Sequence, residues 1–201
     1  MKTPIDTSRL RVAARVLLLV ASGSAAEVPL PAPAPTPTPV ARAPEPTLKA
    51  AFLYNFALFV EWPEEARKGP LLICVLGTDP FGEVLPATLR SKTANGRKLR
   101  SAVAVTAAEI APCSVLYVPA AESATHRRIL DTLAGRPILT VGESEEFLDA
   151  GGIIRLFLDG GRLRFEVNAA AAERSRLKVS AQLLELSRKG TKGPGERAAD
   201  R

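Results

Sequence analysis

Residues 71–82 read LLICVLGTDPFG, and this stretch sets the expectation for the fold. It begins with an unbroken apolar run that closes on a glycine. A short apolar run without polar alternation is typical of a strand that is covered on both faces. The TDPFG that follows is rich in turn residues, and residues 81–89 then fit a short helix. A buried strand that leads through a turn into a helix indicates an α/β domain.

The same alternation continues along the chain. Further strands are expected at residues 102–106, 113–118 and 137–141, and further helical segments at residues 122–133 and 144–152. The stretch GIIRLFLDGGRLRFEVN, residues 152–168, predicts a hairpin that turns at Asp-Gly-Gly. Asn168 can then cap a last helix over residues 169–188. The sequence therefore predicts an α/β fold: a mixed, mostly parallel sheet of about six strands, with helices on both faces, ending in an antiparallel hairpin.

The first 46 residues are expected to precede the folded domain. Residues 1–26 hold basic residues, a short apolar run and small residues in the order of a secretory signal peptide; a disordered basic leader is the alternative. Residues 27–46 contain eight prolines, which favour an extended spacer. The domain is expected at residues 47–188, with Thr47 as N-cap, and a disordered tail at 189–201. No other segment is apolar over the length that crosses a bilayer, so no membrane insertion is expected.

Charge and polar residues argue against several functions. The net charge is +6, half of it in residues 1–26, and no basic cluster with interleaved aromatics indicates nucleic acid. His126 is the single histidine and is expected on the outer face of a helix, which disfavours a histidine zinc site or a Ser-His-Asp triad. The sequence contains neither a Gly-x-Gly-x-x-Gly motif nor a P-loop. We therefore expect a binding protein and not an enzyme, with no metal or cofactor.

Half of the aromatic residues lie in one segment. Residues 48–63 read LKAAFLYNFALFVEWP and hold five of the ten aromatics. Their spacing predicts a helix that is apolar on both sides and ends at the proline. Such a helix must be covered on both sides. We expect one side to pack on the sheet and the other, with Leu53, Tyr54, Leu58 and Trp62, to meet a partner or a second copy. Complete burial within the domain is the alternative.

The two cysteines, Cys74 and Cys113, each lie in or at the start of an expected buried strand. Two buried free thiols would fit that placement. In an exported protein, a cysteine pair in neighbouring strands is better explained by a disulfide. The two cysteines are 39 residues apart. Closing a loop of this length with a disulfide would stabilise the fold by roughly 4 kcal/mol on the chain-entropy model.

The turn after the first strand is a candidate ligand site. In open α/β sheets, ligands bind at the carboxyl ends of the strands. Gly77 and Gly82 would let a ligand approach the backbone, and Thr78 and Asp79 would supply polar groups. An ordinary strand-to-helix turn is the alternative.

Several segments together resemble one family. They are LKAAFLYNFALFVEWP, LLICVLGTDPFG, NGRKL, CSVLYV, the block from ILTVGES to RFEVN, and LKVSAQLLEL. In this order, over residues 48–188, they resemble the YfiR-like family. That resemblance implies a periplasmic repressor that dimerises and binds the periplasmic sensor domain of an inner-membrane diguanylate cyclase, which lowers cyclic di-GMP and biofilm formation.

The resemblance also bears on the cysteines and on the partner. It places a disulfide on Cys74 and Cys113, whereas the second cysteine pair that some members hold is missing here. The expected partner is a membrane-bound diguanylate cyclase or another membrane sensor protein, together with a second copy of the chain. The alternative function is a periplasmic sensory module that binds a small molecule.

Overall fold

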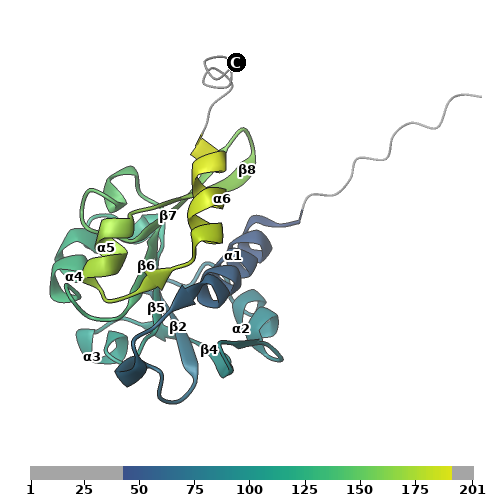
Figure 1. The fold of residues 1–201 in the computed structure, drawn as a ribbon. Coiled ribbons are helices and arrows are strands. Elements are labelled where there is room, and N and C mark those ends of the chain that lie inside the picture. The colour runs from purple at the N-terminus through teal and green to yellow at the C-terminus, as the bar shows by residue number, and fades with distance from the viewer. Residues whose placement is uncertain (1–42, 192–201) are drawn as a thin grey trace, which may run out of the picture. The chain divides into compact units, whose positions relative to one another are not determined.

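Residues 43–191 are described by the structure, a computed structural model (Figure 1). The expected signal peptide, residues 27–42 of the spacer and residues 192–201 of the tail lie outside this range. The helices are α1 (Glu45–Phe59), α2 (Val84–Leu89), α3 (Ala107–Ile110), α4 (His126–Thr132), α5 (Ala169–Arg174) and α6 (Ala181–Thr191). Three 3₁₀ turns are η1 (Glu64–Ala66), η2 (Ala120–Glu122) and η3 (Glu145–Phe147).

Seven strands form the main sheet, in the order β3-β4-β2-β5-β6-β7-β8. They are β2 (Leu71–Leu76), β3 (Thr93–Ala94), β4 (Arg97–Ala104), β5 (Val115–Val118), β6 (Leu139–Gly142), β7 (Ile154–Asp159) and β8 (Arg162–Val167). The pairs from β4 through β7 are parallel, and the two outer pairs, β3–β4 and β7–β8, are antiparallel. The α/β class and the mostly parallel sheet are therefore confirmed. The strand number is seven, since β3 was not expected.

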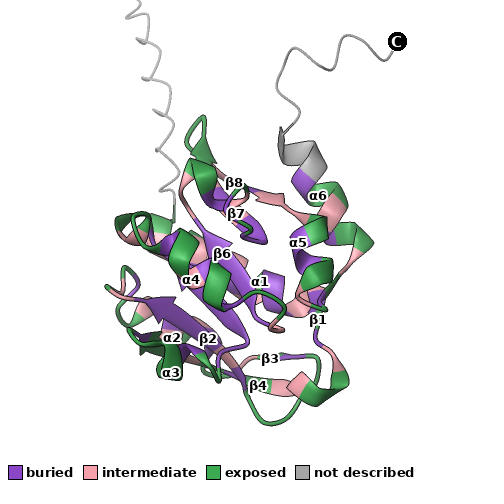
Figure 2. Ribbon diagram, turned by 90° about the vertical axis from the view of Figure 1, so that its left-hand side faces the viewer, coloured by how far each residue is buried: buried purple, intermediate pink, exposed green. Residues whose placement is uncertain are grey.

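The apolar run of β2 explains the layered architecture. Successive side chains of a strand point to opposite faces. Ile73 and Val75 enter a core with α1 and α2, whereas Cys74 and Leu76 enter a second core with residues of α3 and α4. Figure 1 shows the corresponding helices on the two sides of the sheet, and Figure 2 shows its central strands almost entirely buried. A run without polar alternation is thus the signature of a strand between two helical layers.

The expected hairpin is confirmed. Strands β7 and β8 pair from Ile154 with Val167 to Asp159 with Arg162. Gly160 and Gly161 form the turn with φ of 55° and 70°, a backbone region that other residues adopt only with strain. On the inner side, the ring of Phe165 lies 5.1 Å from that of Phe56 in α1. The hairpin thereby gives part of the aromatic helix its partner within the domain.

The last helix is broken, which corrects the expected single helix over residues 169–188. Asn168 does cap α5, because its Oδ1 accepts a hydrogen bond from the Ala171 amide at 3.0 Å. The helix then ends at Arg174, and Arg176, two residues further on, has a left-handed φ of 56°. A short strand, β9 (Lys178–Val179), follows and pairs with β1 (Val60–Glu61) at the end of α1. That pairing, which links distant parts of the chain, overrides the helical pattern of the sequence.

The first helix begins three residues earlier than expected. It starts at Glu45 after Pro44, and Pro46 occupies its first turn, where a missing amide hydrogen costs nothing. No side chain caps this end, so Thr47 is not the N-cap.

His126 is buried, which corrects its expected place on a solvated face. It is 6% exposed, and its ring lies 5.8 Å from that of Phe147. Helix α4 begins at His126 and not at residue 122, so His126 and Leu130 share the inward face at i and i+4. The Phe147 ring in turn fits against two glycines: a Cβ on Gly142 or Gly152 would come within 2.2 Å of it.

Candidate functional site

A disulfide joins the centre of the sheet to the segment before β5. Cys74 of β2 and Cys113 are bonded, with their Cα atoms 5.9 Å apart and 39 residues apart in sequence. Both are buried in the core that faces α3 and α4. The predicted disulfide is therefore confirmed, and the alternative of two free thiols is excluded.

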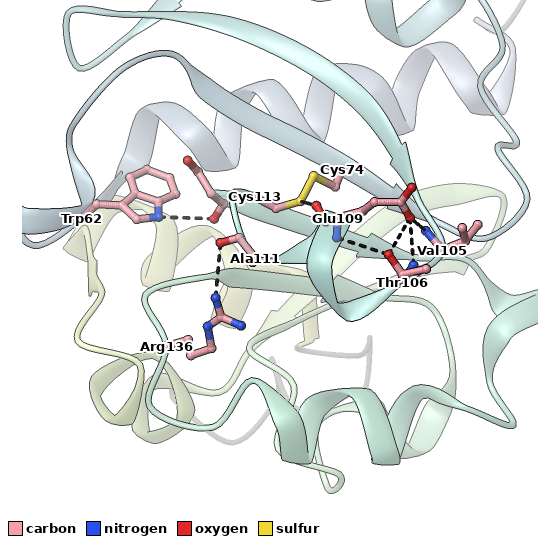
Figure 3. The surroundings of a disulfide bond; sticks show 9 residues. Trp62, Cys74, Val105, Thr106, Glu109, Ala111, Cys113 and Arg136 are labelled. Atoms are coloured by element: carbon pink, nitrogen blue, oxygen red, sulfur yellow. Dashed lines mark hydrogen bonds between the residues drawn. A yellow bond between two sulfur atoms is a disulfide. The ribbon is translucent and has the colours of Figure 1, made fainter.

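Other interactions hold the same segment (Figure 3). Thr106 and Glu109 form a capping box at the start of α3, just upstream of Cys113. The Glu109 carboxylate accepts hydrogen bonds from the Val105 and Thr106 amides, each at 2.9 Å. These bonds, the one from Val105 first, lower the pKa of Glu109. Downstream, the Trp62 indole donates to the carbonyl of Ser114. The disulfide thus lies within a segment that is fixed on both sides.

The aromatic helix is covered mainly by its own domain. Leu53 is fully buried and Trp62 is 3% exposed, so neither presents a surface to a partner. The expectation that these two residues contact a partner is therefore wrong in this fold. Helix α2 and the sheet cover Leu53, and Trp62 follows β1 and packs into the same core. Tyr54 and Leu58 are only partly buried at the edge of the core, and Tyr54 lies beneath the Lys92 ammonium, 4.2 Å from its ring centre. They remain candidates for a partner-facing edge.

The turn after β2 is packed by its own side chains. Gly77 and Gly82 both have positive φ, 66° and 51°. The Asp79 carboxylate accepts a hydrogen bond from the Phe81 amide at 2.8 Å, which closes the turn. Glu122 lies against Gly77: a Cβ at position 77 would come within 2.2 Å of its Oε1. The expected ligand site at Gly77, Thr78, Asp79 and Gly82 therefore has a carboxylate where a ligand would approach the first glycine, and it stays a prediction.

A partly buried polar network lies at the same edge of the sheet, and the sequence did not point to it. The hydroxyl of Tyr117 in β5 donates to Oε1 of Glu143, just after β6, at 2.5 Å. Lys49 of α1 forms ion pairs with Glu143 and, at 2.6 Å, with Glu45. The second Glu143 oxygen accepts the Ala120 amide at 3.0 Å. One carboxylate therefore connects α1 with the carboxyl ends of two parallel strands.

Burial and hydrogen bonding shift the titration of this network. Burial, and then the hydrogen bond to Glu143, raise the pKa of Tyr117 above its usual 10.0. Burial alone would lower the pKa of Lys49, but its hydrogen bonds and charge interactions with Glu143 and Glu45 raise it above the usual 10.5. Both groups therefore keep their protons across the neutral range, so the network works as a structural clamp.

A cavity of about 450 Å³ opens beside the network, between the start of α1 and the β7–β8 hairpin. Its charged lining consists of Glu45, Lys49, Glu143, Glu145, Arg155 and Asp159. Arg155 pairs with Glu166 at 3.2 Å, while its Nε is buried without a hydrogen-bond partner among the described residues. Of the cavities, this one best fits the expectation that ligands bind at the carboxyl ends of parallel strands.

A family model described as YfiR/HmsC-like matches residues 46–188. That span is most of the chain and reaches from the start of α1 into α6. The chain belongs to the YfiR/HmsC-like family. The resemblance drawn from the sequence is therefore confirmed, and the match begins within α1, next to the helix start in the structure.

The YfiR/HmsC-like domain shows no metal centre in its described part. Among residues 43–191, no group of three or more His, Cys, Asp or Glu side chains is placed to hold a metal ion. Over the same residues, no helix combines the length and the apolar character needed to cross a bilayer. The described residues include a disulfide, a partly buried polar clamp with a cavity beside it, and partly exposed apolar edges. These features suit binding, as expected for a family of periplasmic regulators.

Proposed function

We propose that this YfiR/HmsC-like protein is a periplasmic repressor that holds an inner-membrane diguanylate cyclase inactive by binding its sensor domain. The observation that carries the proposal is the family match over residues 46–188. The disulfide supports it, because structural disulfides persist in oxidising compartments such as the periplasm. The sequence expectation of a signal peptide in residues 1–26 points the same way.

Repression by binding has an energetic requirement. The protein must bind the inactive state of the cyclase more tightly than the active state, because only differential affinity shifts the equilibrium. A tenfold shift requires about 1.4 kcal/mol of such preference. A rigid domain presents its binding groups at little entropic cost, and the disulfide and the Glu143 clamp supply that rigidity here. For the contact surface we propose the edge of α1 with Tyr54 and Leu58, and we propose that the protein acts as a dimer.

Cellular cyclic di-GMP tests the proposal. Deleting the gene should raise it, and supplying the full chain should restore it. A chain that lacks residues 1–26 should remain in the cytoplasm and fail to restore it. Leu58→Glu should weaken repression, whereas Val105→Gln, at a site 67% exposed in the loop after β4, should not. If deletion leaves cyclic di-GMP unchanged in a strain whose parent is shown to express the protein, the protein does not repress a diguanylate cyclase.

The second candidate function is a periplasmic sensory module for a small molecule. The cavity of about 450 Å³ beside Glu143 favours it, because it combines both signs of charge with an apolar wall from the hairpin. Native mass spectrometry of the protein purified from its own periplasm should then show a bound metabolite, which Arg155→Gln loses and the surface variant Arg162→Gln keeps. A protein that carries no such mass while still repressing the cyclase would exclude this function.

A further inference from the structure

The amino-terminal edge of the sheet holds a second, more basic cavity. It has a volume of about 410 Å³ and lies beside the disulfide residue Cys113, at the edge opposite to the Glu143 clamp. Four cationic side chains and one carboxylate line it. The cations are Lys68, Arg97, Arg136 and Arg176, and the carboxylate is Glu65. The excess of positive charge sets it apart from the carboxyl-edge cavity, where acidic groups predominate.

Arg97 is one of the four cations that line this cavity, and it also borders a neighbouring cavity beside Trp62. It lies at the first position of β4, and its Nε and Nη2 donate to the carbonyls of Gly69 and Pro70 at 3.0 and 2.9 Å. These bonds fix the guanidinium plane. Its remaining nitrogen, Nη1, is buried and has no hydrogen-bond partner among residues 43–191. Burial also lowers the pKa of Arg97. A guanidinium that is anchored on one side and lacks an acceptor on the other is prepared to receive an anion.

Arg176 reaches the same cavity from a strained position. It stands where the chain leaves α5 with a left-handed φ of 56°, a place at which glycine is usual. Its guanidinium pairs with Glu65 of η1. Arg136 comes from the loop before β6 and donates to the Ala111 carbonyl at 3.3 Å (Figure 3). The lining residues of this cavity come from five separate segments of the chain. Such a convergence of cations and polar groups is unusual for an ordinary solvated surface.

We propose that this cavity binds the phosphate group of a small molecule. Lys68, Arg97 and Arg136 have no carboxylate partner among residues 43–191. Three such cations match a dianionic phosphate better than a single carboxylate, and guanidinium groups suit phosphate oxygens in geometry. The volume exceeds that of a bare phosphate, so a small phosphate ester fits the cavity. The bound group would contact the segment that the disulfide anchors. This site is independent of the surface proposed for cyclase binding.

Heteronuclear NMR of the disulfide-bonded protein tests the site. Sodium phosphate, added at constant ionic strength against sodium chloride, should shift the amides of Arg97, Cys113 and Ser114 with saturation. Arg136→Gln should weaken binding by about tenfold or more, as expected for loss of a charged hydrogen-bond donor. The matched control is Arg100→Gln, which removes one exposed charge from the same strand outside this cavity and should bind as the parent does. Lys68→Gln provides a second variant if Arg136→Gln does not fold.

Binding measurements with other ligands identify the source of the phosphate group. Glycerol 3-phosphate should bind at least as well as phosphate, and sodium succinate should bind more weakly. Phosphatidylglycerol vesicles that co-sediment the protein, with loss in Lys68→Gln, would identify a lipid headgroup as the source. Absence of saturable shifts with phosphate and glycerol 3-phosphate, equal weakening in Arg100→Gln and Arg136→Gln, or equal binding of succinate would overturn the proposal.

Discussion

The indole Nε1 of Trp62 donates a buried hydrogen bond to the carbonyl oxygen of Ser114, 3.2 Å away and 52 residues along the chain. Ser114 follows the disulfide residue Cys113, and its carbonyl also accepts the amide of Leu139 at the start of β6. The only tryptophan of the chain therefore joins the end of the aromatic helix to the segment that the disulfide anchors. The sequence predicted that this ring contacts a partner. In the structure it connects two parts of the core.

Trp62→Phe should lower the free energy of unfolding by about 1–2 kcal/mol, because it removes a buried hydrogen bond and part of a packed ring. Urea unfolding followed by circular dichroism measures the change. Leu186→Ala, at a site 48% exposed in α6, serves as the control and should change it by less than about 0.5 kcal/mol. Equal unfolding midpoints for Trp62→Phe and the parent would contradict the role of this bond.

Replacing both cysteines, Cys74→Ala with Cys113→Ala, should lower stability by about 4 kcal/mol, because the unfolded chain gains the freedom of an unclosed loop of 39 residues. Chemical unfolding of the parent with and without reductant should differ by a similar amount. Thiol labelling of the denatured, non-reduced parent provides the control and should give no label. Two labels per chain would show that the native protein holds free thiols.

The clamp at Glu143 makes stability depend on alkaline pH. Both Tyr117 and Lys49 have a pKa that is higher in the folded chain than its usual 10.0 or 10.5. Their contribution is therefore complete below those values and is lost as pH rises through the folded-state pKa. Unfolding free energies measured between about pH 8 and 11 should fall less steeply in Tyr117→Phe than in the parent. The surface variant Tyr54→Phe is the matched control; a slope unchanged by Tyr117→Phe would refute the clamp.

Two leucines of α1 separate core from contact surface. Leu53 is fully buried, so Leu53→Glu should abolish folding by placing a charge in the core. Leu58 is partly exposed, so Leu58→Glu should keep the melting temperature within a few degrees while self-association, measured by light scattering, decreases. Circular dichroism distinguishes the two results. A folded Leu58→Glu variant that associates like the parent would show that this edge of α1 is no interface.

Part of the fold followed from local patterns. The apolar run of residues 71–76 determined a strand between two layers, and Asp-Gly-Gly at 159–161 determined a hairpin, because each depends on burial or turn geometry within a few residues. The disulfide followed from two cysteines in strands that were expected to be neighbours. The family, too, could be recognised from the order of its motifs.

Other features were decided only by contacts across the chain. Nothing local shows that Val179 pairs with Val60, and that pairing breaks the last helix. The Glu143 carboxylate became the centre of a partly buried clamp because parallel strands carry Tyr117 and Glu143 to one edge of the sheet and α1 brings Lys49 to the same edge.

The placement of single side chains shows the same limit. A helix that is apolar on both sides says that both sides are covered, but not by what. In the folded domain, other core residues bury Leu53 and Trp62, whereas Tyr54 and Leu58 remain partly exposed at the edge of the core. The sequence by itself thus determined the class of fold, the family and the disulfide. The tertiary structure decided which polar groups meet and which apolar groups remain exposed, because both depend on residues that lie far apart in the chain and come together only when the sheet is formed.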